Sequence, residues 1–380
     1  MPSHPTREIL KAYQFMTGRR ILQRFDELER SQWLGRDELL ALQREKLQRL
    51  VEYAYRHVPY YRRSFKQLGF DPEDLHRDPD SFQELPFVTK QIMRENTAEF
   101  FCDDPKVRKT LRPHYTSGST GEPFTFWEDH NQRDHVTAGI FRSLTWSGWR
   151  LGDAHGYLWG SNLEQTPWRD RLRQHIQHFC FNQFVVSASD LSPANLDKLV
   201  RRIRQRRPQV LTGYSGALCV FAQYVKDLNL SDIKLRAVYG SAEVLYPHQR
   251  RLLEDVFDCR VFNRYATTEL GVLGYECAAH SGLHVSVENN HFEILQGEQP
   301  AADGEPGEIA VTNLNNYGFP FIRYRLKDVV KSHEGPCACG RQSPMIECVQ
   351  GRTVDIFRTI DGNPVWLEPG LFQVAHIRQL

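Results

Sequence analysis

The sequence has no long apolar run and almost no net charge. No window of the 380 residues approaches the roughly 20 apolar residues that a membrane-spanning helix needs. The N-terminal segment MPSHPTREILKAYQF lacks the apolar centre of a secretory signal. The 48 Lys and Arg residues nearly balance the 47 Asp and Glu residues, and the formal net charge is +1. This balance gives no global attraction to nucleic acid or to acidic membranes. We therefore expect a cytoplasmic protein with neither kind of partner.

The eight cysteines do not form the dense pattern of a disulfide-stabilised miniprotein. In a chain without an export signal they are expected to be thiols or metal ligands. Cys277 and His284 lie in the string CAAHSGLH, and Cys337 and Cys339 form a C-A-C string. Three thiols and one imidazole match a closed, four-coordinate structural zinc site. His280 competes with His284 for the fourth place, and the alternative is a set of buried free thiols and surface loop residues.

Length and composition predict an ordinary globular chain of two or three domains, with 40% hydrophobic and 25% charged residues. Apolar residues recur at helical spacing in residues 5–62, so this segment is predicted to be helical, with Val58-Pro59 as its end. Short helices and loops are predicted for residues 63–113, and a long helix for residues 131–146.

From residue 156 onward, short apolar runs alternate with helical patterns. The predicted strands are Gly156–Trp159, Gln209–Thr212, Leu235–Tyr239, Arg260–Phe262 and Glu308–Thr312. The predicted helices between them are Leu196–Arg206, Gly216–Asp227 and Tyr246–Val256. Such alternation favours an α/β fold with a mainly parallel sheet. Ligands of such sheets lie beyond the carboxyl ends of the strands, and Gly213, Gly240 and Tyr265 each follow a predicted strand.

The densest cluster of small and polar residues is Tyr115–Phe124, YTSGSTGEPF, directly after His114. Its glycines allow backbone angles that a side chain would forbid, and successive free N–H groups can form an anion-binding concavity. The residues expected to hold phosphate are Ser117, Gly118, Ser119, Thr120 and Gly121. The loop is not a Walker A sequence, because no Lys follows Gly121. The alternative is an ordinary polar turn.

Four further segments carry polar residues near predicted strand ends. They are Tyr239–Leu245 (YGSAEVL), Tyr265–Gly271 (YATTELG), Gly307–Val330 and Gly351–Asp355 (GRTVD). Tyr265 can stack on a base, and Glu269 can hold Mg²⁺, which prefers one or two carboxylates plus phosphate oxygens. Asp328 can accept hydrogen bonds from a ribose diol. The alternatives are a carboxylate at the start of a helix for Glu269, and an ion pair with Arg323 or Arg325 for Asp328.

Together and in this order, these five segments resemble the adenylate-forming enzyme superfamily. The specific resemblance is to the phenylacetate–coenzyme A ligase family, in its branch associated with capsular polysaccharide clusters. The N-terminal part agrees through Gln43–Leu50, Val58–Arg62 (VPYYR), and Leu85-Pro86 followed by Thr89-Lys90. The resemblance covers nearly the whole chain. It implies the large N-terminal domain of these enzymes, with layered β-sheets flanked by helices and a small barrel-like part.

The resemblance implies a role for each matching residue. The phosphate loop would cradle pyrophosphate, Thr268 would contact the α-phosphate, and Glu269 would hold Mg²⁺. Tyr265 would lie on one side of the adenine, and Asp328 and Arg352 would bind the ribose hydroxyls. The residues that would line the other side of the adenine are Ser241, Ala242 and Glu243, and the other residues assigned to the nucleotide are Ala266 and Thr267. The residues that would border the acyl pocket are Gly213, Tyr214 and Gly240.

In this family a carboxylate attacks the α-phosphate of ATP to give an acyl-adenylate and pyrophosphate, and coenzyme A then takes the acyl group. The resemblance therefore implies ATP, Mg²⁺ and coenzyme A as ligands, a small carboxylic acid as substrate, and structural Zn²⁺ at the Cys and His positions. A homodimer is also expected. Two other interpretations are kept: an amine or a hydroxyl captures the adenylate, or the chain is a non-catalytic nucleotide-binding member of the fold.

The identity of the acid does not follow from the sequence. Five aromatic residues are candidates for lining its pocket, although such residues more often belong to the core. They are Trp146, Trp149, Tyr157, Trp159 and Tyr214.

The expected division is an N-terminal helical segment at 1–100, an AMP-binding core with the zinc subsite at 101–352, and a hinge with the start of a mostly absent C-terminal domain at 353–380. In the superfamily that domain supplies a catalytic Lys, so we expect this chain to bind ATP and acid but to turn over slowly alone. Two departures stand out: no basic residue follows Gly121, and Val354 stands where a polar hinge residue is expected.

Overall fold

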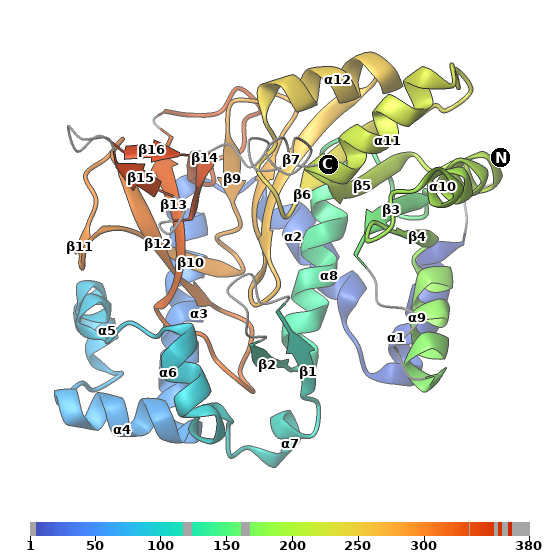
Figure 1. Cartoon of the computed structure of the whole chain (residues 1–380). Coiled ribbons are helices and arrows are strands. Elements are labelled where there is room, and N and C mark those ends of the chain that lie inside the picture. Colours follow the sequence, from blue (N-terminus) through green and yellow to red (C-terminus); the bar gives the residue numbers. More distant parts are fainter. Residues whose placement is uncertain are drawn as a thin grey trace.

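The structure is a computed structural model that describes residues 5–116, 124–160, 168–333, 335–352, 356–358 and 364–366. In this part of the chain, short helices come first and a large sheet with helices on both faces follows (Figure 1). No helix among the described residues combines the length and the apolar character needed to cross a bilayer.

The first hundred residues form separate helices. Their bounds are α1 Thr6–Thr17, α2 Ile21–Ser31, α3 Arg36–His57, α4 Pro59–Leu68, α5 Asp74–Arg77, η1 Pro79–Glu84, α6 Lys90–Glu95 and η2 Thr97–Phe100, with α7 Pro105–Arg108 next. Gly18 ends α1 with a φ of 67°, in the left-handed region that favours glycine. Gly35 precedes α3, and its N–H donates to Glu38 Oε2 at 2.9 Å. Pro59 begins α4, where a missing N–H leaves no bond unmade. The prediction of helix for residues 5–62 is right in type but misses these breaks.

The later helices are α8 His130–Thr145, α9 Trp168–Cys180, α10 Pro193–Arg206, α11 Ser215–Asp227 and α12 Pro247–Phe257. The strands are β1 Arg112–Tyr115, β2 Thr125–Glu128, β3 His155–Trp159, β4 Gln183–Ser187, β5 Val210–Tyr214, β6 Ala237–Ser241, β7 Arg260–Thr267, β8 Gly271–Glu276, β9 Leu283–Val285, β10 Asn290–Gln296, β11 Gln299–Pro300, β12 Pro306–Asn313, β13 Tyr324–Ser332, β14 Met345–Arg352, β15 Ile356–Arg358 and β16 Pro364–Trp366. The structure confirms the long helix α8, the three helices α10 to α12, and the five predicted strands, which are β3, β5, β6, β7 and β12. It adds α9 and β4, which the sequence patterns did not predict.

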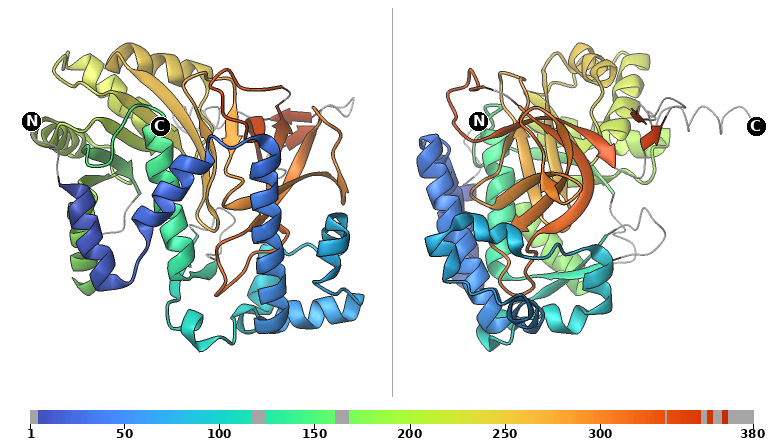
Figure 2. Two further views of the ribbon diagram at one scale, coloured as in Figure 1. Left: turned by 180° about the vertical axis from the view of Figure 1, so that it is seen from behind. Right: turned by 90° about the vertical axis from the view of Figure 1, so that its left-hand side faces the viewer.

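One twelve-stranded sheet runs in the order β11-β10-β12-β13-β14-β9-β8-β7-β6-β5-β3-β4. Strands β3 to β7 pair in parallel, whereas the strands from β8 to β14 pair antiparallel. The prediction of a mainly parallel sheet is therefore right for one half and wrong for the other. Short connections without helices join the strands of the second half, and such connections produce antiparallel pairs. Figure 2 shows that this half curves strongly.

Helices cover both faces of the parallel half. On one face, α10, α11 and α12 pack through Leu199, Leu218 and Leu253 onto the sheet. On the other face, α8 packs with α1 and α2, and Phe141 and Phe262 belong to that core. The parallel half is thus a doubly wound α/β layer, whose ligands are expected at the carboxyl ends of its strands.

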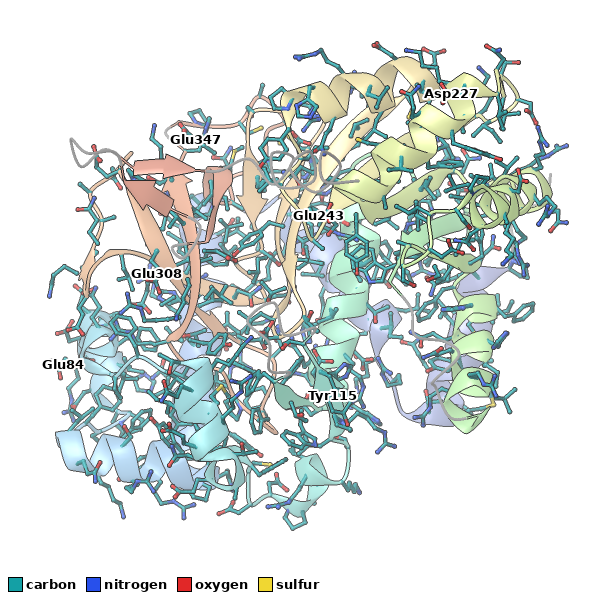
Figure 3. The ribbon with its side chains drawn as sticks, viewed as in Figure 1. Glu84, Tyr115, Asp227, Glu243, Glu308 and Glu347 are labelled. Carbon is teal, nitrogen blue, oxygen red and sulfur yellow. The ribbon has the colours of Figure 1, made fainter. Side chains whose placement is uncertain are left out.

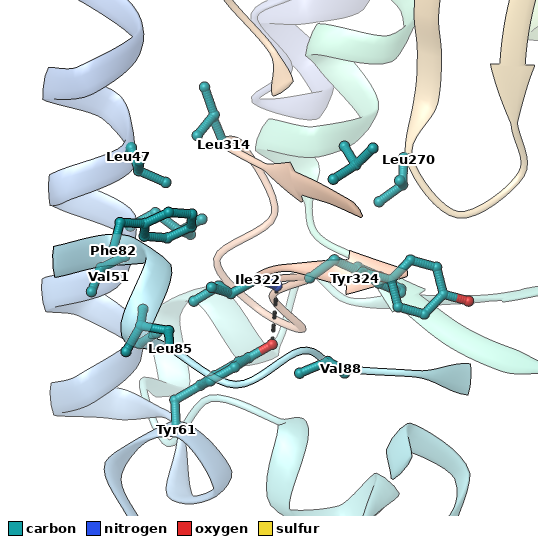
Figure 4. Packing of buried hydrophobic residues seen from close by; sticks show 14 of the residues in the cluster. Leu47, Val51, Tyr61, Phe82, Leu85, Val88, Leu270, Leu314, Ile322 and Tyr324 are labelled. Atoms are coloured by element: carbon teal, nitrogen blue, oxygen red, sulfur yellow. Dashed lines mark hydrogen bonds between the residues drawn. The ribbon is translucent and has the colours of Figure 1, made fainter. Parts of the chain in front are cut away.

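The N-terminal helices and the antiparallel half share one core. Leu47 and Val51 of α3 pack in the same cluster as Leu314 and Ile322 of the sheet region (Figure 4). Tyr61 Oη accepts a hydrogen bond from Ile322 N at 3.1 Å and donates one to the carbonyl of residue 320 at 3.0 Å. These contacts fix the helical segment against the strands that carry the candidate site.

Candidate functional site

The loop after His114 is held between β1 and β2, which form an antiparallel hairpin with Tyr115 opposite Thr125. One step further, Thr116 N donates to the Phe124 carbonyl at 3.0 Å, and Phe124 N donates to Thr116 Oγ1 at 3.1 Å. Tyr115 is 64% exposed and is labelled in Figure 3. The predicted phosphate residues lie outside the described part of the chain, namely Ser117, Gly118, Ser119, Thr120 and Gly121. The structure therefore places only the two flanks of the loop.

The turn between β7 and β8 carries the candidate α-phosphate and Mg²⁺ residues. Thr268 is exposed, whereas Glu269 is 8% exposed. Thr267 Oγ1 accepts a hydrogen bond from Leu270 N at 3.2 Å, which closes the turn. Gly271 follows with a φ of 76° and begins a strand, so the alternative of a helix start at Glu269 is wrong. The turn offers one hydroxyl to solvent and one buried carboxylate, a pair that suits phosphate and its cation.

Tyr265 and Asp328 come from strands far apart in the sequence and meet directly. Tyr265 Oη donates a hydrogen bond to Asp328 Oδ2 at 2.6 Å. Lys327 has a φ of 65°, and the pairing of β13 with β14 shifts after Asp328. Such bulges re-aim a neighbouring side chain. In register, Asp328 lies opposite Arg352, for which only the backbone is described. Two predicted nucleotide side chains thus meet, and the backbone of a third predicted residue lies opposite one of them.

The two arginines near Asp328 pair with other acids. Arg323 Nη2 lies 2.7 Å from Glu293 Oε1, and Arg325 Nε lies 2.9 Å from Glu308 Oε1. Glu308 is labelled on β12 in Figure 3. These pairs contradict the alternative in which Asp328 serves as the ion-pair partner of the two arginines.

The segment expected beside the adenine ends β6 and is held by several contacts. Ser241 is buried, and its Oγ donates to the Arg264 carbonyl at 3.2 Å. Ala242 has a φ of 66°, which is unusual for a residue with a side chain. Glu243 Oε2 accepts from Gly216 N at 2.8 Å, at the start of α11, where a carboxylate is favourable. The three residues therefore have a fixed position at the carboxyl end of the parallel strands.

The expectation that Gly213 and Gly240 follow their strands is wrong, because both lie inside β5 and β6. A Cβ on Gly240 would come within 2.9 Å of Ser215 Oγ, and one on Gly213 within 2.8 Å of a backbone oxygen of β3. Close packing between strands and helices thus requires glycine at both positions. Tyr265 likewise lies inside β7, which extends beyond its predicted end.

The five candidate aromatic residues divide into two groups. Trp149 is 2% exposed and Trp146 is 9% exposed, and both belong to core clusters. Tyr157, Trp159 and Tyr214 keep partial exposure on the parallel half of the sheet, and the rings of Trp159 and Tyr214 stack with centroids 4.6 Å apart. Only this second group is placed to meet a ligand.

A neutral pair of titratable groups lies at the base of the hairpin. His114 Nε2 lies 3.1 Å from Glu128 Oε2. Burial raises the pKa of Glu128 to about 8, although Arg133 acts in the opposite direction. Burial, with a smaller contribution from Arg133, lowers the pKa of His114 to about 4. Near neutral pH the two groups therefore share a hydrogen bond without carrying opposite charges.

The four predicted zinc ligands form a compact cluster. All ligand atoms of Cys277, His284, Cys337 and Cys339 lie within 4.8 Å of one another. Cys277 Sγ lies 3.5 Å from Cys337 Sγ, and Cys339 Sγ lies 3.3 Å from His284 Nε2. Ser343 Oγ lies 3.0 Å from His284 Nδ1, and this contact leaves Nε2 for the cluster. Three thiols and one imidazole in this arrangement fit a closed tetrahedral zinc site.

His280 lies apart from this cluster. Its Nδ1 is 3.1 Å from Arg250 Nη1 and 3.3 Å from Glu276 Oε1. His284 is therefore the histidine of the cluster, which decides the competition between the two. Burial, followed by the charge of Arg341, lowers the pKa of His284 to about 4 and keeps the imidazole in the neutral form that binds metals.

Comparisons with known proteins agree over most of the chain. No family model matches. The chain is 26% identical over 358 residues to a phenylacetate–coenzyme A ligase of Thermus thermophilus, covering 90% of this chain and 77% of that protein. It is 27% identical over 356 residues to the phenylacetate–coenzyme A ligase of Escherichia coli K12, covering 90% and 78%. Protein CapK of Staphylococcus aureus is 23% identical over 352 residues, covering 92% and 75%.

The fold agrees with the same group. A crystal structure of 2-hydroxyisobutyryl-CoA ligase in the postadenylation state, in complex with R3-HIB-AMP, matches with a TM-score of 0.75. The identity is 20%, and the match covers 93% of this chain and 75% of that one. The sequence of this chain is thus similar to phenylacetate–coenzyme A ligases, and its fold matches that of 2-hydroxyisobutyryl-CoA ligase.

The sequence interpretation missed one cation. Lys90 begins α6, and its Nζ lies 3.4 Å from Glu269 Oε1 and 5.6 Å from the centre of the Phe124 ring. It reaches this place because the segment before it pairs with β13, where Val88 N donates to the Arg323 carbonyl at 3.0 Å. In the sequence, Thr89-Lys90 was noted only as part of the family resemblance and received no role in the site. The pairing with β13 brings Lys90 to the turn after β7.

Proposed function

We propose that this chain uses ATP to convert a carboxylic acid into an acyl-adenylate and then transfers the acyl group to coenzyme A. The observation that carries the proposal is the hydrogen bond of Tyr265 to Asp328, with Glu269 in the turn that follows the strand of Tyr265. The similarity to phenylacetate–coenzyme A ligases over 90% of the chain supports the same chemistry.

The reaction has two displacement steps. In the first, a carboxylate oxygen attacks the α-phosphorus, and the bond to the pyrophosphate oxygen breaks. In the second, the thiol sulfur of coenzyme A attacks the acyl carbon, and AMP leaves with the bonding electrons. Neither step needs a covalent bond to the protein, so positioning and charge stabilisation account for the catalysis.

The described side chains suit that task. The Tyr265 ring would stack on the base while its hydroxyl holds Asp328, whose carboxylate would accept from the ribose. The Thr268 hydroxyl would donate to the α-phosphate. Glu269 would hold Mg²⁺, which supplies positive charge to the phosphates when bound. The Lys90 ammonium, 3.4 Å from Glu269, would supply the cation that the loop lacks after Gly121.

The test of this proposal is acid-dependent exchange of pyrophosphate into ATP. Glu269→Gln keeps the size of the side chain but removes its charge, so it should abolish the Mg²⁺-dependent exchange. Glu305→Gln changes an exposed carboxylate elsewhere and should leave exchange unchanged. Full exchange in the Glu269 variant would contradict the assignment.

A second acceptor class is an amine or a hydroxyl in place of coenzyme A. It is favoured by the similarity to Protein CapK, whose name does not describe a coenzyme A ligase. The two acceptors are distinguished by AMP release, which would then depend on an added amine or alcohol and not on coenzyme A. A non-catalytic protein of this fold would bind ATP without any acid-dependent exchange.

We also propose that Cys277, His284, Cys337 and Cys339 hold a structural zinc ion. The mutual distances within 4.8 Å and the contact from Ser343 support this assignment. With four protein ligands no coordination position is left for water, so the ion would join the end of β8 to the segment before β14 without taking part in catalysis.

A further inference from the structure

Arg264 is a buried arginine that lacks a counterion among the described residues. It is 4% exposed, and its Nε and Nη1 atoms have no hydrogen-bond partner. Burial lowers the pKa of Arg264, and the groups acting in the opposite direction are the hydroxyls of Tyr157, Tyr239 and Tyr275, with no carboxylate among them. An unpaired buried guanidinium is costly, so its presence calls for a partner that the described chain does not provide.

Two of the three neighbouring hydroxyls already have partners. Tyr239 Oη donates to the Ser143 carbonyl at 2.6 Å, and Tyr275 Oη lies 3.0 Å from Ser286 Oγ. Both phenols are neutral, and neither accepts a hydrogen bond from Nε or Nη1 of Arg264, so they do not compensate the charge of the guanidinium. The donors of Arg264 remain available to an acceptor that comes from outside the fold.

The position of Arg264 coincides with the acyl side of the proposed site. In register, Tyr214 pairs with Ser241, and Ser241 pairs with Arg264, so the three lie in one row, which passes through the last residues of β5 and β6 and the middle of β7. Trp159 stacks on Tyr214 and extends the row to β3. Neighbouring strands lie about 4.8 Å apart, so this row spans the dimensions of a small organic acid.

The row is accessible from the strand ends, and the guanidinium charge acts across it. Tyr157, Trp159 and Tyr214 are partly exposed. After burial, the charge of Arg264 is the next influence on the pKa of His155, which lies well below its usual value. The same charge acts on the Tyr157 hydroxyl against the effect of burial, which raises the pKa of Tyr157. The cation thus faces groups of β3 across the sheet.

We propose that Arg264 recognises a second carboxylate at the far end of the substrate, so that the preferred acids of this chain are dicarboxylates. The inference rests on the proposed function, because that function places the acyl group beside Tyr214 and Gly240. A planar guanidinium can bind a carboxylate through two parallel hydrogen bonds and neutralise its own charge. A monocarboxylic acid with an apolar end would leave the guanidinium buried and unpaired.

The experiment compares matched pairs of acids on the full chain by isothermal titration calorimetry in the presence of AMP. The pairs are succinate with butanoate, adipate with hexanoate, and terephthalate with benzoate. We expect at least one dicarboxylate to bind about tenfold or more tightly than its partner, because a charge-assisted bidentate contact is gained. If no dicarboxylate binds more tightly than its monocarboxylate, the proposal is overturned.

Variants assign the preference to the guanidinium. Arg264→Leu should weaken the preferred dicarboxylate about 10- to 100-fold and leave or improve binding of the matched monocarboxylate. Without ligand it should be as stable as the wild type or more stable, because the buried cation is lost. Arg260→Leu removes an exposed arginine at the other end of the same strand and should change nothing. Equal loss for both acids in Arg264→Leu would contradict the proposal.

Arg264→Lys decides the matter if the leucine variant does not fold. Lysine keeps the charge but not the fork, so dicarboxylate affinity should fall while the preference for dicarboxylates persists. Unchanged affinity in Arg264→Lys would overturn the proposal.

Pyrophosphate exchange with the same acids separates this inference from the proposed function. Exchange with monocarboxylates alone would refute only the dicarboxylate inference. Arg264-dependent binding without exchange by any acid would refute only the proposed function.

Discussion

In the antiparallel half of the sheet, the buried Arg323 pairs with Glu293 at 2.7 Å, whereas in the parallel half the buried Arg264 has no described carboxylate beside it. Arg142 of α8 repeats the first pattern, because both of its terminal nitrogens contact Glu288. The paired arginines connect helices and loops to strands, and their charges are compensated within the fold. The unpaired one lies in the middle of β7 and pairs in register with the last residue of β6, beside the strand ends where ligands bind. Charge compensation thus distinguishes a structural arginine from one available to a ligand.

Removing a paired arginine gives the largest expected effect on stability. Arg142→Leu leaves the Glu288 carboxylate buried without its cation, which should lower the free energy of unfolding by about 3–5 kcal/mol. Urea denaturation followed by circular dichroism measures the change. Arg264→Leu is the counterpart and should lose no stability. Similar losses for the two variants would remove the distinction between the paired and the unpaired arginine.

Replacing Lys90 tests whether a cation at the junction of the two halves of the sheet is needed for pyrophosphate exchange. Lys90→Met keeps much of the apolar stem but removes the charge beside Glu269. We expect pyrophosphate exchange to fall about 10²- to 10³-fold, by analogy with the loss of one preorganised donor. Lys226→Met changes an exposed lysine on α11 and serves as the control. Exchange at the wild-type rate in the Lys90 variant would mean that the loop acts without this cation.

The proposed zinc site of the antiparallel half gives a smaller expected effect. Ser343→Ala removes the contact to His284 Nδ1 but keeps all four ligands, so zinc affinity should fall about 10- to 100-fold. Competition with a chromophoric chelator measures the affinity, and Ser231→Ala, an exposed site, is the control. Purified protein that contains no zinc in either form would refute the metal assignment.

The most gradual expected effect is the pH dependence set by Glu128 at the base of the hairpin of β1 and β2. Its pKa of about 8 in the folded protein lies above the usual 4.5 of a free carboxyl, so the contribution of Glu128 to folding stability is complete below pH 4.5 and is lost as pH rises toward 8. Glu128→Gln should remove this loss, which amounts to about 1.4 kcal/mol per pH unit at most. The free energies of unfolding of the wild type and of Glu128→Gln should therefore agree at pH 4.5. At pH 8.5 the variant should be the more stable of the two. A wild-type advantage at pH 8.5 would contradict the neutral state of Glu128.

Local patterns predicted much of the parallel half. Helices α10 to α12 have regular apolar spacing and clear ends, and strands β3, β5 and β6 are short apolar runs. The antiparallel half was harder to predict from the sequence. Bulges interrupt β8 and β13, and residues such as Lys327 have positive φ angles. Polar residues such as Asp328 and Arg325 also lie inside its strands, where a period-two pattern is weak.

The candidate site was predicted where motifs are local and missed where it depends on pairing between distant segments. Thr268 and Glu269 share one turn with Tyr265, and a single motif identified them. The contact of Lys90 with Glu269 requires the pairing of Val88 with β13, which no local pattern reveals. The unpaired state of Arg264 is likewise invisible in the sequence, since it depends on which carboxylates the fold brings near.

The most direct measurement is a single-turnover incubation of the full chain with ATP, Mg²⁺ and the panel of acids, followed by mass spectrometry of the bound products. A slow reaction is sufficient for this readout. The account predicts the acyl-adenylate of at least one acid with the wild-type chain and none with Glu269→Gln. Bound ATP that never yields an adenylate with any acid would contradict the assignment of this chain as an acid-activating enzyme.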